Sequence, residues 1–136
     1  MAMNLPSKIE AVDSCVFLRF LERDIPVQEK SARDLFLSGC DLYVSESVIS
    51  EVIYVMRKDH YSRKSIIENF SLLLNNPMFI YDRKFFEPIF EDYVKYPSLS
   101  FEDLVIAKRA EEHGCKTLWT FDRKFANQSE VAKLLD

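Results

Sequence analysis

Short apolar runs alternate with longer amphipathic stretches along this chain. The short runs, rich in β-branched and aromatic residues, predict strands at Ile9–Val12, Asp41–Val44, Met78–Tyr81 and Thr117–Thr120. The longer stretches repeat their apolar residues at helical spacing, and a final helix is expected near the end of the sequence. The predicted helices are Ser14–Arg23, Val27–Ser38, Ser47–Lys58, Ser62–Leu74, Lys84–Val94, Phe101–His113 and Ser129–Leu135.

Residues that start and stop helices support these boundaries. Ser47 and Ser62 suit N-caps, Gly39 and Gly114 suit C-terminal stops, and Pro77 prevents a helix just before the third strand. Alternating strands and helices with short connections are typical of a three-layer α/β/α fold with a mostly parallel sheet. We expect a single α/β domain over residues 1–136, because no linker or internal repeat divides the chain.

Four acidic residues stand where a strand ends or within apolar helical surroundings: Asp13, Glu51, Asp103 and Asp122. In parallel sheets, ligands bind beyond the carboxyl ends of the strands, and Asp13 and Asp122 each follow a predicted strand. If the fold gathers the four carboxylates, their repulsion favours a divalent cation bound through oxygen ligands. The pattern therefore predicts metal-dependent chemistry on phosphate.

Each acid also has a structural interpretation. Asp13 suits an N-cap, a role compatible with metal binding through the second oxygen. Glu51 shares a helical face with apolar residues and leans toward the core, although it could turn outward to solvent. Asp103 follows Ser100 at the spacing of a capping box, and Asp122 could be a turn residue.

Composition and charge narrow the setting. The formal charge of −4 argues weakly against a nucleic-acid partner, but cation binding at the four acids leaves −4 + 4 = 0 for the remainder. Basic residues could form a rim that holds a phosphate backbone. Those considered are Arg19, Arg23, Arg57, Lys58, Arg63, Lys64, Arg83, Lys84, Arg123 and Lys124.

Other reactive or aromatic residues are interpreted as structural. Cys15, Cys40 and Cys115 are odd in number and widely spaced, which indicates neither disulfides nor a zinc site and fits a reducing cytoplasmic setting. No signal peptide or membrane span is expected. His60 and His113 are expected at helix ends. Packing in the core is expected for Cys15, Trp119 and the phenylalanines of Phe79–Phe90.

In order along the chain, four motifs resemble the PIN-domain nucleases, and among them the VapC-type toxins of bacterial toxin–antitoxin pairs. The motifs are Ala11–Arg19, Val48–Val52, Ser100–Ala107 and Leu118–Phe125, so the resemblance covers almost the whole sequence. Each motif is weak alone, and their order and spacing together are specific. The chain departs from the family at two positions. Cys15 stands where an Asn is common, and Lys124 stands where a second Asp is common.

The resemblance implies hydrolysis of RNA phosphodiester bonds with Mg²⁺ or Mn²⁺. It implies Asp13 and Asp103 as principal metal ligands, Glu51 as a ligand or as the residue that orients the attacking water, and Asp122 as the residue that completes the site. Ser14 and Thr120 would donate hydrogen bonds behind these acids. The resemblance further implies a homodimer and a cognate antitoxin protein that lies across the acidic site.

Three alternatives concern function. A haloacid dehalogenase-type phosphatase needs a second Asp two residues after the first. This chain has Cys15 there, so that alternative is rejected. A PIN nuclease with an RNA-processing role stays open, as does a PIN-like binding module that has lost catalysis.

A dimer face could lie on the Ile49–Met56 apolar residues or on the Ile66–Leu74 helix, although a buried core explains both.

Overall fold

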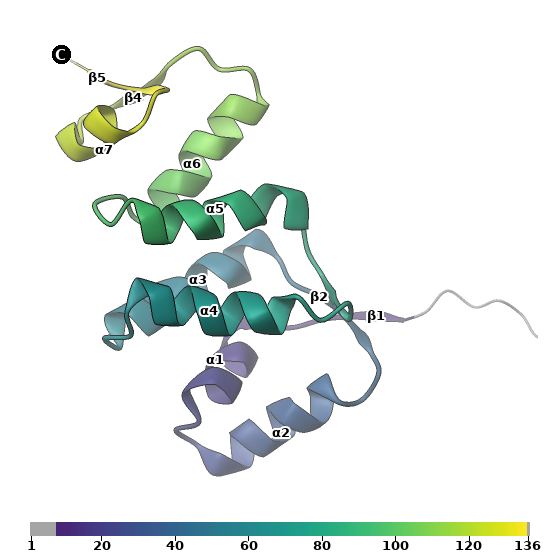
Figure 1. The fold of residues 1–136 in the computed structure, drawn as a ribbon. Coiled ribbons are helices and arrows are strands. Elements are labelled where there is room, and N and C mark those ends of the chain that lie inside the picture. The colour runs from purple at the N-terminus through teal and green to yellow at the C-terminus, as the bar shows by residue number, and fades with distance from the viewer. Residues whose placement is uncertain (1–7, 136) are drawn as a thin grey trace, which may run out of the picture. The chain divides into compact units, whose positions relative to one another are not determined.

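The computed structural model describes residues 8–135, which fall into two units. Unit 1 comprises residues 8–61 and 68–81, and unit 2 comprises residues 62–67 and 82–135. Figure 1 shows their elements, and each unit is described by itself.

Unit 1 contains a three-stranded parallel sheet of β1 (Ile9–Ala11), β2 (Asp41–Tyr43) and β3 (Phe79–Ile80), in the order β1-β2-β3. Ile9 pairs with Asp41, and Leu42 pairs with Phe79. Helices α1 (Ser14–Glu22) and α2 (Pro26–Phe36) follow β1, and α3 (Glu46–Lys58) follows β2. Helix α1 packs against both α2 and α3. The strand that ends at Ala11 therefore delivers Asp13 to the start of a packed helix.

Four buried phenylalanines from different elements form the aromatic core of unit 1. The ring of Phe17 contacts those of Phe36, Phe70 and Phe79, with neighbouring centroids 5.2–5.7 Å apart. Such contacts bury large apolar areas and fix ring orientation. The apolar face of α3 is buried as well, and it contains Ile49, Val52, Ile53 and Met56. That face is core, so the suggestion that it serves as a dimer face is wrong.

Helix α4 (Arg63–Leu74) is shared by the two units, because its first residues belong to unit 2 and the rest to unit 1. Ile66, Phe70 and Leu74 on this helix are buried and form core, whereas Leu72 is exposed.

Unit 2 contains α5 (Arg83–Lys95), α6 (Phe101–Glu112) and α7 (Arg123–Gln128), with the strands β4 (Leu118–Thr120) and β5 (Ala132–Leu134). The strands pair in parallel, with Trp119 opposite Lys133. The rings of Phe86 and Phe101 stack with centroids 6.3 Å apart and pack α5 against α6.

The predicted elements agree with the structure except near the end of the chain. The helix predicted over Ser129–Leu135 is wrong, because Ala132–Leu134 forms β5 on β4. Helix α7 was not predicted. Helix α3 begins earlier than expected, since Ser45 rather than Ser47 is its N-cap. Gly39 and Gly114 have φ values of +83° and +69° beyond α2 and α6, as helix stops require.

The strands of the described residues make two parallel sheets, where the sequence predicted one. His60 lies just beyond α3 and His113 caps α6, as predicted. Within residues 8–135 no helix is long and apolar enough to cross a membrane.

Candidate active site

Asp13 is the N-cap of α1 and lies beyond the carboxyl end of β1. Its Oδ1 accepts a hydrogen bond from the Ser14 backbone N–H at 2.7 Å, and the buried Ser14 hydroxyl lies 3.4 Å from the same oxygen. The other oxygen, Oδ2, faces the Cys15 thiol at 3.9 Å, a weak donor at that distance. The cap therefore fixes the carboxylate and leaves Oδ2 available to a cation.

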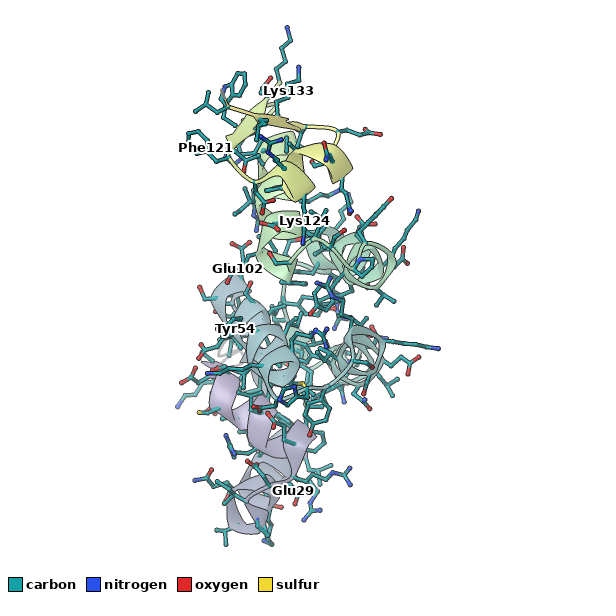
Figure 2. The ribbon with its side chains drawn as sticks, turned by 90° about the vertical axis from the view of Figure 1, so that its left-hand side faces the viewer. Glu29, Tyr54, Glu102, Phe121, Lys124 and Lys133 are labelled. Atoms are coloured by element: carbon teal, nitrogen blue, oxygen red, sulfur yellow. The ribbon has the colours of Figure 1, made fainter. Side chains whose placement is uncertain are left out.

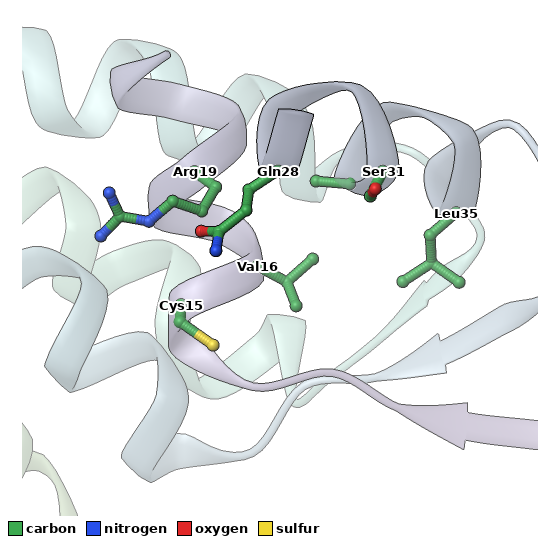
Figure 3. A pocket seen from close by; sticks show the side chains of 7 residues that line it. Cys15, Val16, Arg19, Gln28, Ser31 and Leu35 are labelled. Carbon is green, nitrogen blue, oxygen red and sulfur yellow. The ribbon is translucent and has the colours of Figure 1, made fainter. Parts of the chain in front are cut away.

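Cys15 is exposed, so its predicted place in the core is wrong. With Val16 and Arg19 of α1 it lines a pocket of about 360 Å³, and Figure 3 shows these side chains facing those of α2. The side chains from α2 are Gln28, Ser31, Ala32 and Leu35. The pocket has an apolar wall and opens beside the first acidic residue.

Glu51 lies on the exposed face of α3, opposite the buried face of that helix. The expectation that it leans toward the core is wrong, because Val52 and Ile53 rather than Glu51 occupy the inward positions. Its carboxylate makes no hydrogen bond or ion pair with other described residues, so both oxygens are available. Tyr54 stands one turn further along and is also exposed (Figure 2).

Asp103 forms the capping box that its spacing from Ser100 predicted. Its Oδ2 accepts from the Ser100 backbone N–H at 3.1 Å, and the Ser100 hydroxyl accepts from the Asp103 N–H at 3.0 Å. These two bonds begin α6 and orient the carboxylate. Within the described part of the chain Oδ1 has no hydrogen-bond partner, so capping and metal binding are compatible at this residue.

Asp122 caps the short helix α7 with a single oxygen. Oδ1 accepts from the backbone N–H groups of Lys124 at 2.9 Å and Phe125 at 3.2 Å. The Thr120 hydroxyl accepts a hydrogen bond from the Asp122 N–H at 3.0 Å, so it holds the backbone rather than donating to the carboxylate. Among the residues described, Oδ2 is without a hydrogen-bond partner.

The four acids are divided between the units. Asp13 and Glu51 belong to unit 1, and Asp103 and Asp122 belong to unit 2. Over residues 8–135 no three His, Cys, Asp or Glu side chains lie close enough to hold a metal ion. The chemistry of the donor set still fits a hard divalent cation, because every candidate is a carboxylate with at least one oxygen that no cap uses.

Arg63 and Arg19, which the sequence placed in the basic rim, are committed to structural contacts. The Arg63 guanidinium donates to the carbonyl oxygens of Tyr93 at 3.0 Å and Leu99 at 2.6 Å, and it lies over the Tyr93 ring. Arg19 forms an ion pair with Asp24. Both side chains therefore hold the fold and are poorly suited to bind phosphate.

A further acidic group, which the sequence did not single out, lies near the C-terminal ends of α1 and α3. The pKa of Glu22 is raised to about 7 by burial and by its hydrogen bond and repulsion with Asp59. Asp24 adds repulsion, and Arg19 opposes the shift. This carboxyl therefore keeps its proton at pH values where an ordinary glutamate is ionised.

The PIN domain family model matches residues 11–131, a span that includes all four acids. The chain belongs to the PIN domain family. This membership confirms the predicted fold class, the α/β PIN fold of three α/β/α layers with a parallel sheet. The PIN chain is also similar to a protein named VapC ribonuclease from Aquifex aeolicus (strain VF5). The two are 27% identical over 124 residues, which cover 86% of this chain and 90% of the relative. No solved structure matches the chain.

Proposed function

We propose that this PIN-family chain is a metal-dependent endoribonuclease that hydrolyses RNA phosphodiester bonds with Mg²⁺ or Mn²⁺. The observation that carries the proposal is the similarity to a VapC ribonuclease along 90% of that protein's length. The four candidate acids all lie inside the region that matches the PIN domain. The proposal treats the two units as one functional domain, in which Asp13 and Glu51 act together with Asp103 and Asp122.

A bound divalent ion would supply an activated water and would neutralise charge on the phosphate, so no histidine base is required. Asp13 and Asp103 would be the principal ligands, each through the oxygen that its cap leaves available. Glu51 would bind the ion or orient the water, and Asp122 would complete the site. The helix caps hold three of these carboxylates in one orientation before any ligand arrives, which lowers the cost of ordering them.

As in the VapC-type systems it resembles, the protein would be the toxin of a type II toxin–antitoxin pair, acting in the cytoplasm as a homodimer. A cognate antitoxin would lie across the acidic site and neutralise it with basic side chains. Such a segment would also reach the pocket beside Asp13, whose Val16, Ala32 and Leu35 wall suits an apolar side chain. An RNA-processing nuclease without a toxin role remains a second candidate, because the same carboxylate chemistry serves both.

The deciding experiment compares wild-type protein with Asp13→Asn on a pool of single-stranded RNA and tRNA. Reactions contain Mg²⁺, Mn²⁺ or a chelator. Asn is as good an N-cap as Asp, so the variant should fold normally while its metal affinity falls. Cleavage should require metal and should drop at least about a hundredfold in the variant. Asp34→Asn, an exposed acid of α2 in the same unit, serves as the matched control and should retain activity.

Chelator-resistant cleavage, or equal cleavage by wild type and Asp13→Asn, would contradict the proposed role of this acid. A folded wild-type protein that binds RNA and cleaves none of the pool with either metal would favour the decayed binding module.

A further inference from the structure

Asp13 and Cys15 bring a carboxylate and a thiol together at the first turn of α1. The Asp13 side chain folds back over the start of the helix, as an N-cap does, and Cys15 is the second residue of that helix. The Cys15 Sγ lies 3.9 Å from Asp13 Oδ2, the oxygen that the cap does not use. Both residues belong to unit 1 and to one helical turn, so their contact is set locally.

The distance between these two atoms suits a single metal ion bound to both. Bonds from Zn²⁺ of about 2.3 Å to sulfur and about 2.1 Å to oxygen, at a tetrahedral angle, place the two ligand atoms roughly 3.6 Å apart. The observed 3.9 Å is close to that spacing, so a small rotation of either side chain brings both atoms onto one ion. Neither atom makes another hydrogen bond or ion pair with the described residues, so no other contact is lost when the ion binds.

A buried hydroxyl supports the Asp13 carboxylate from the other side. Ser14 is 5% exposed, and among residues 8–135 it is the one polar or charged residue that is buried. Its Oγ lies 3.4 Å from Asp13 Oδ1, which also accepts from the Ser14 N–H at 2.7 Å. Hydrogen bonds of this kind orient the carboxylates that bind metals. Asp13 is therefore held with Oδ2 beside the Cys15 sulfur.

A sulfur atom changes which cation this turn prefers. Mg²⁺ and Mn²⁺ prefer oxygen ligands, whereas a thiolate prefers softer ions such as Zn²⁺. The four candidate acids offer only oxygen, and Cys15 adds sulfur to that set. The spacing of the cysteines along the chain indicates no zinc site, because such spacing detects sites built from several cysteines. Here the sulfur is paired with a carboxylate instead.

We propose that Cys15 sets the metal selectivity of the candidate centre. With Asp13 Oδ2 it binds Zn²⁺ through sulfur, so that Zn²⁺ displaces the Mg²⁺ or Mn²⁺ on which hydrolysis depends. The inference rests on the proposed function, because it concerns the ion at the same centre. As the metal–sulfur bond forms, the thiol proton passes to solvent and the sulfur keeps the electron pair. The pocket of about 360 Å³ that Cys15 lines leaves room for water molecules on the ion (Figure 3).

The experiment measures metal binding in the absence of RNA. Protein loaded with Mn²⁺ is titrated with Zn²⁺, and electron paramagnetic resonance follows the Mn²⁺ that is released. Zn²⁺ binds most sites more tightly than Mn²⁺, so the informative quantity is the change in the ratio of the two affinities on substitution. Cys15→Ser replaces sulfur by oxygen and should lower this ratio at least about tenfold, through a loss of Zn²⁺ affinity. Asp13→Asn should weaken the binding of both ions.

Cys40 provides a matched control. Its Sγ lies 3.2 Å from Glu10 Oε1, so it is also a thiol beside a carboxylate. Cys40 precedes β2 and Asp13 follows β1, so these two residues lie at opposite edges of the parallel sheet. Cys40→Ser should leave the affinity ratio unchanged. With one equivalent of Cd²⁺ as the probe, the ultraviolet charge-transfer band of a cadmium–thiolate bond should be lost in Cys15→Ser and kept in Cys40→Ser.

Three results would overturn the inference. These are Mn²⁺ that Zn²⁺ does not displace, an affinity ratio that Cys15→Ser leaves unchanged, or a cadmium–thiolate band that is lost in Cys40→Ser instead. Failure of the nuclease itself looks different, because a wild type that cleaves no RNA would still lose its Zn²⁺ selectivity in Cys15→Ser. If the nuclease stands and the inference does not, cleavage needs Asp13 while Zn²⁺ affects the wild type and Cys15→Ser equally.

Discussion

Three of the four candidate acids use one carboxylate oxygen to start a helix. Asp13, Asp103 and Asp122 each satisfy backbone N–H groups that a helix start leaves without partners. One oxygen therefore has a structural task and the other remains available for chemistry. Structural and functional interpretations of such a residue do not compete, and a test must remove one role at a time.

Asp103 allows that separation. Asp103→Asn retains an amide oxygen that can accept from the Ser100 N–H, so stability should change by less than about 0.5 kcal/mol, whereas cleavage should fall at least about a hundredfold. Ser100→Ala removes the hydroxyl of the same capping box and should lower stability by about 1 kcal/mol while metal-dependent kcat is retained. Denaturant unfolding and single-turnover cleavage measure the two effects. Equal losses of activity in both variants would mean that Asp103 acts only as a cap.

Glu22 predicts a pH dependence of stability. Below its ordinary pKa of 4.5 both folded and unfolded chains hold the proton. Between pH 4.5 and about 7 the Glu22 carboxyl ionises in the unfolded chain but keeps its proton in the folded chain. The free energy of unfolding therefore falls as the pH rises. After allowance for solvent screening, the loss should be about 1–2 kcal/mol.

Urea unfolding at intervals from pH 4.5 to 8 measures this loss. Glu22→Gln keeps the hydrogen bond without the charge and should flatten the profile. Glu91→Gln, on the exposed side of α5, should leave it as in the wild type. A wild-type profile with no fall in this window would contradict the role of the Glu22 and Asp59 pair.

The residues that sequence patterns placed correctly are those whose role is local. Caps and helix stops depend on a few neighbouring residues, so Asp13, Asp103 and Gly114 could be predicted. Cys15, Glu51 and Trp119 were expected to face the core, whereas the structure has all three exposed. For Trp119 the reason is that β4 is short and every residue in it suits either face, so alternation alone cannot decide which face is buried.

At the scale of elements, long amphipathic helices were the most predictable parts, because several turns of apolar periodicity support each one. The segment from Ser129 to Leu135 is too short for such support. Its backbone pairs with β4 instead, in the register that joins Leu118 to Ala132 and Thr120 to Leu134. Pairing with β4, a strand elsewhere in the sequence, determines the structure of this segment. Local sequence patterns do not contain that information.

Helix α3, which carries Glu51, offers a test of where an element begins. The Ser45 hydroxyl accepts from the Val48 N–H at 3.3 Å, although the sequence suggested Ser47 as the cap. Ser45→Ala should lower the free energy of unfolding by about 1 kcal/mol, and Ser47→Ala, on the exposed surface inside the first turn, should change it by less than about 0.5 kcal/mol. Chemical denaturation of both variants measures the difference. The reverse order of effects would place the start of α3 at the later serine.

At the scale of the whole molecule, the candidate chemistry depends on cooperation between the units. Each unit has its own aromatic core, and each contributes two of the four acids. Each pair alone offers two carboxylates, whereas the four together offer a hard divalent cation a larger set of oxygen ligands. The prediction of a single domain therefore concerns function as well as folding. It stays a prediction, and a measurement of the coupling between the two units tests it.

Metal binding supplies the measure of that coupling. If the four carboxylates bind one ion together, Mn²⁺ should raise the Tm of the wild type, because a ligand that binds only the folded state stabilises it. Asp13→Asn in unit 1 and Asp103→Asn in unit 2 should each abolish most of that rise, and the double variant should lose no more than either single one, since both act on one site. Calorimetry with Mn²⁺ and with chelator measures the shifts, and Asp34→Asn should keep the full rise. Additive losses would instead indicate separate weak sites in the two units and would contradict a shared metal centre.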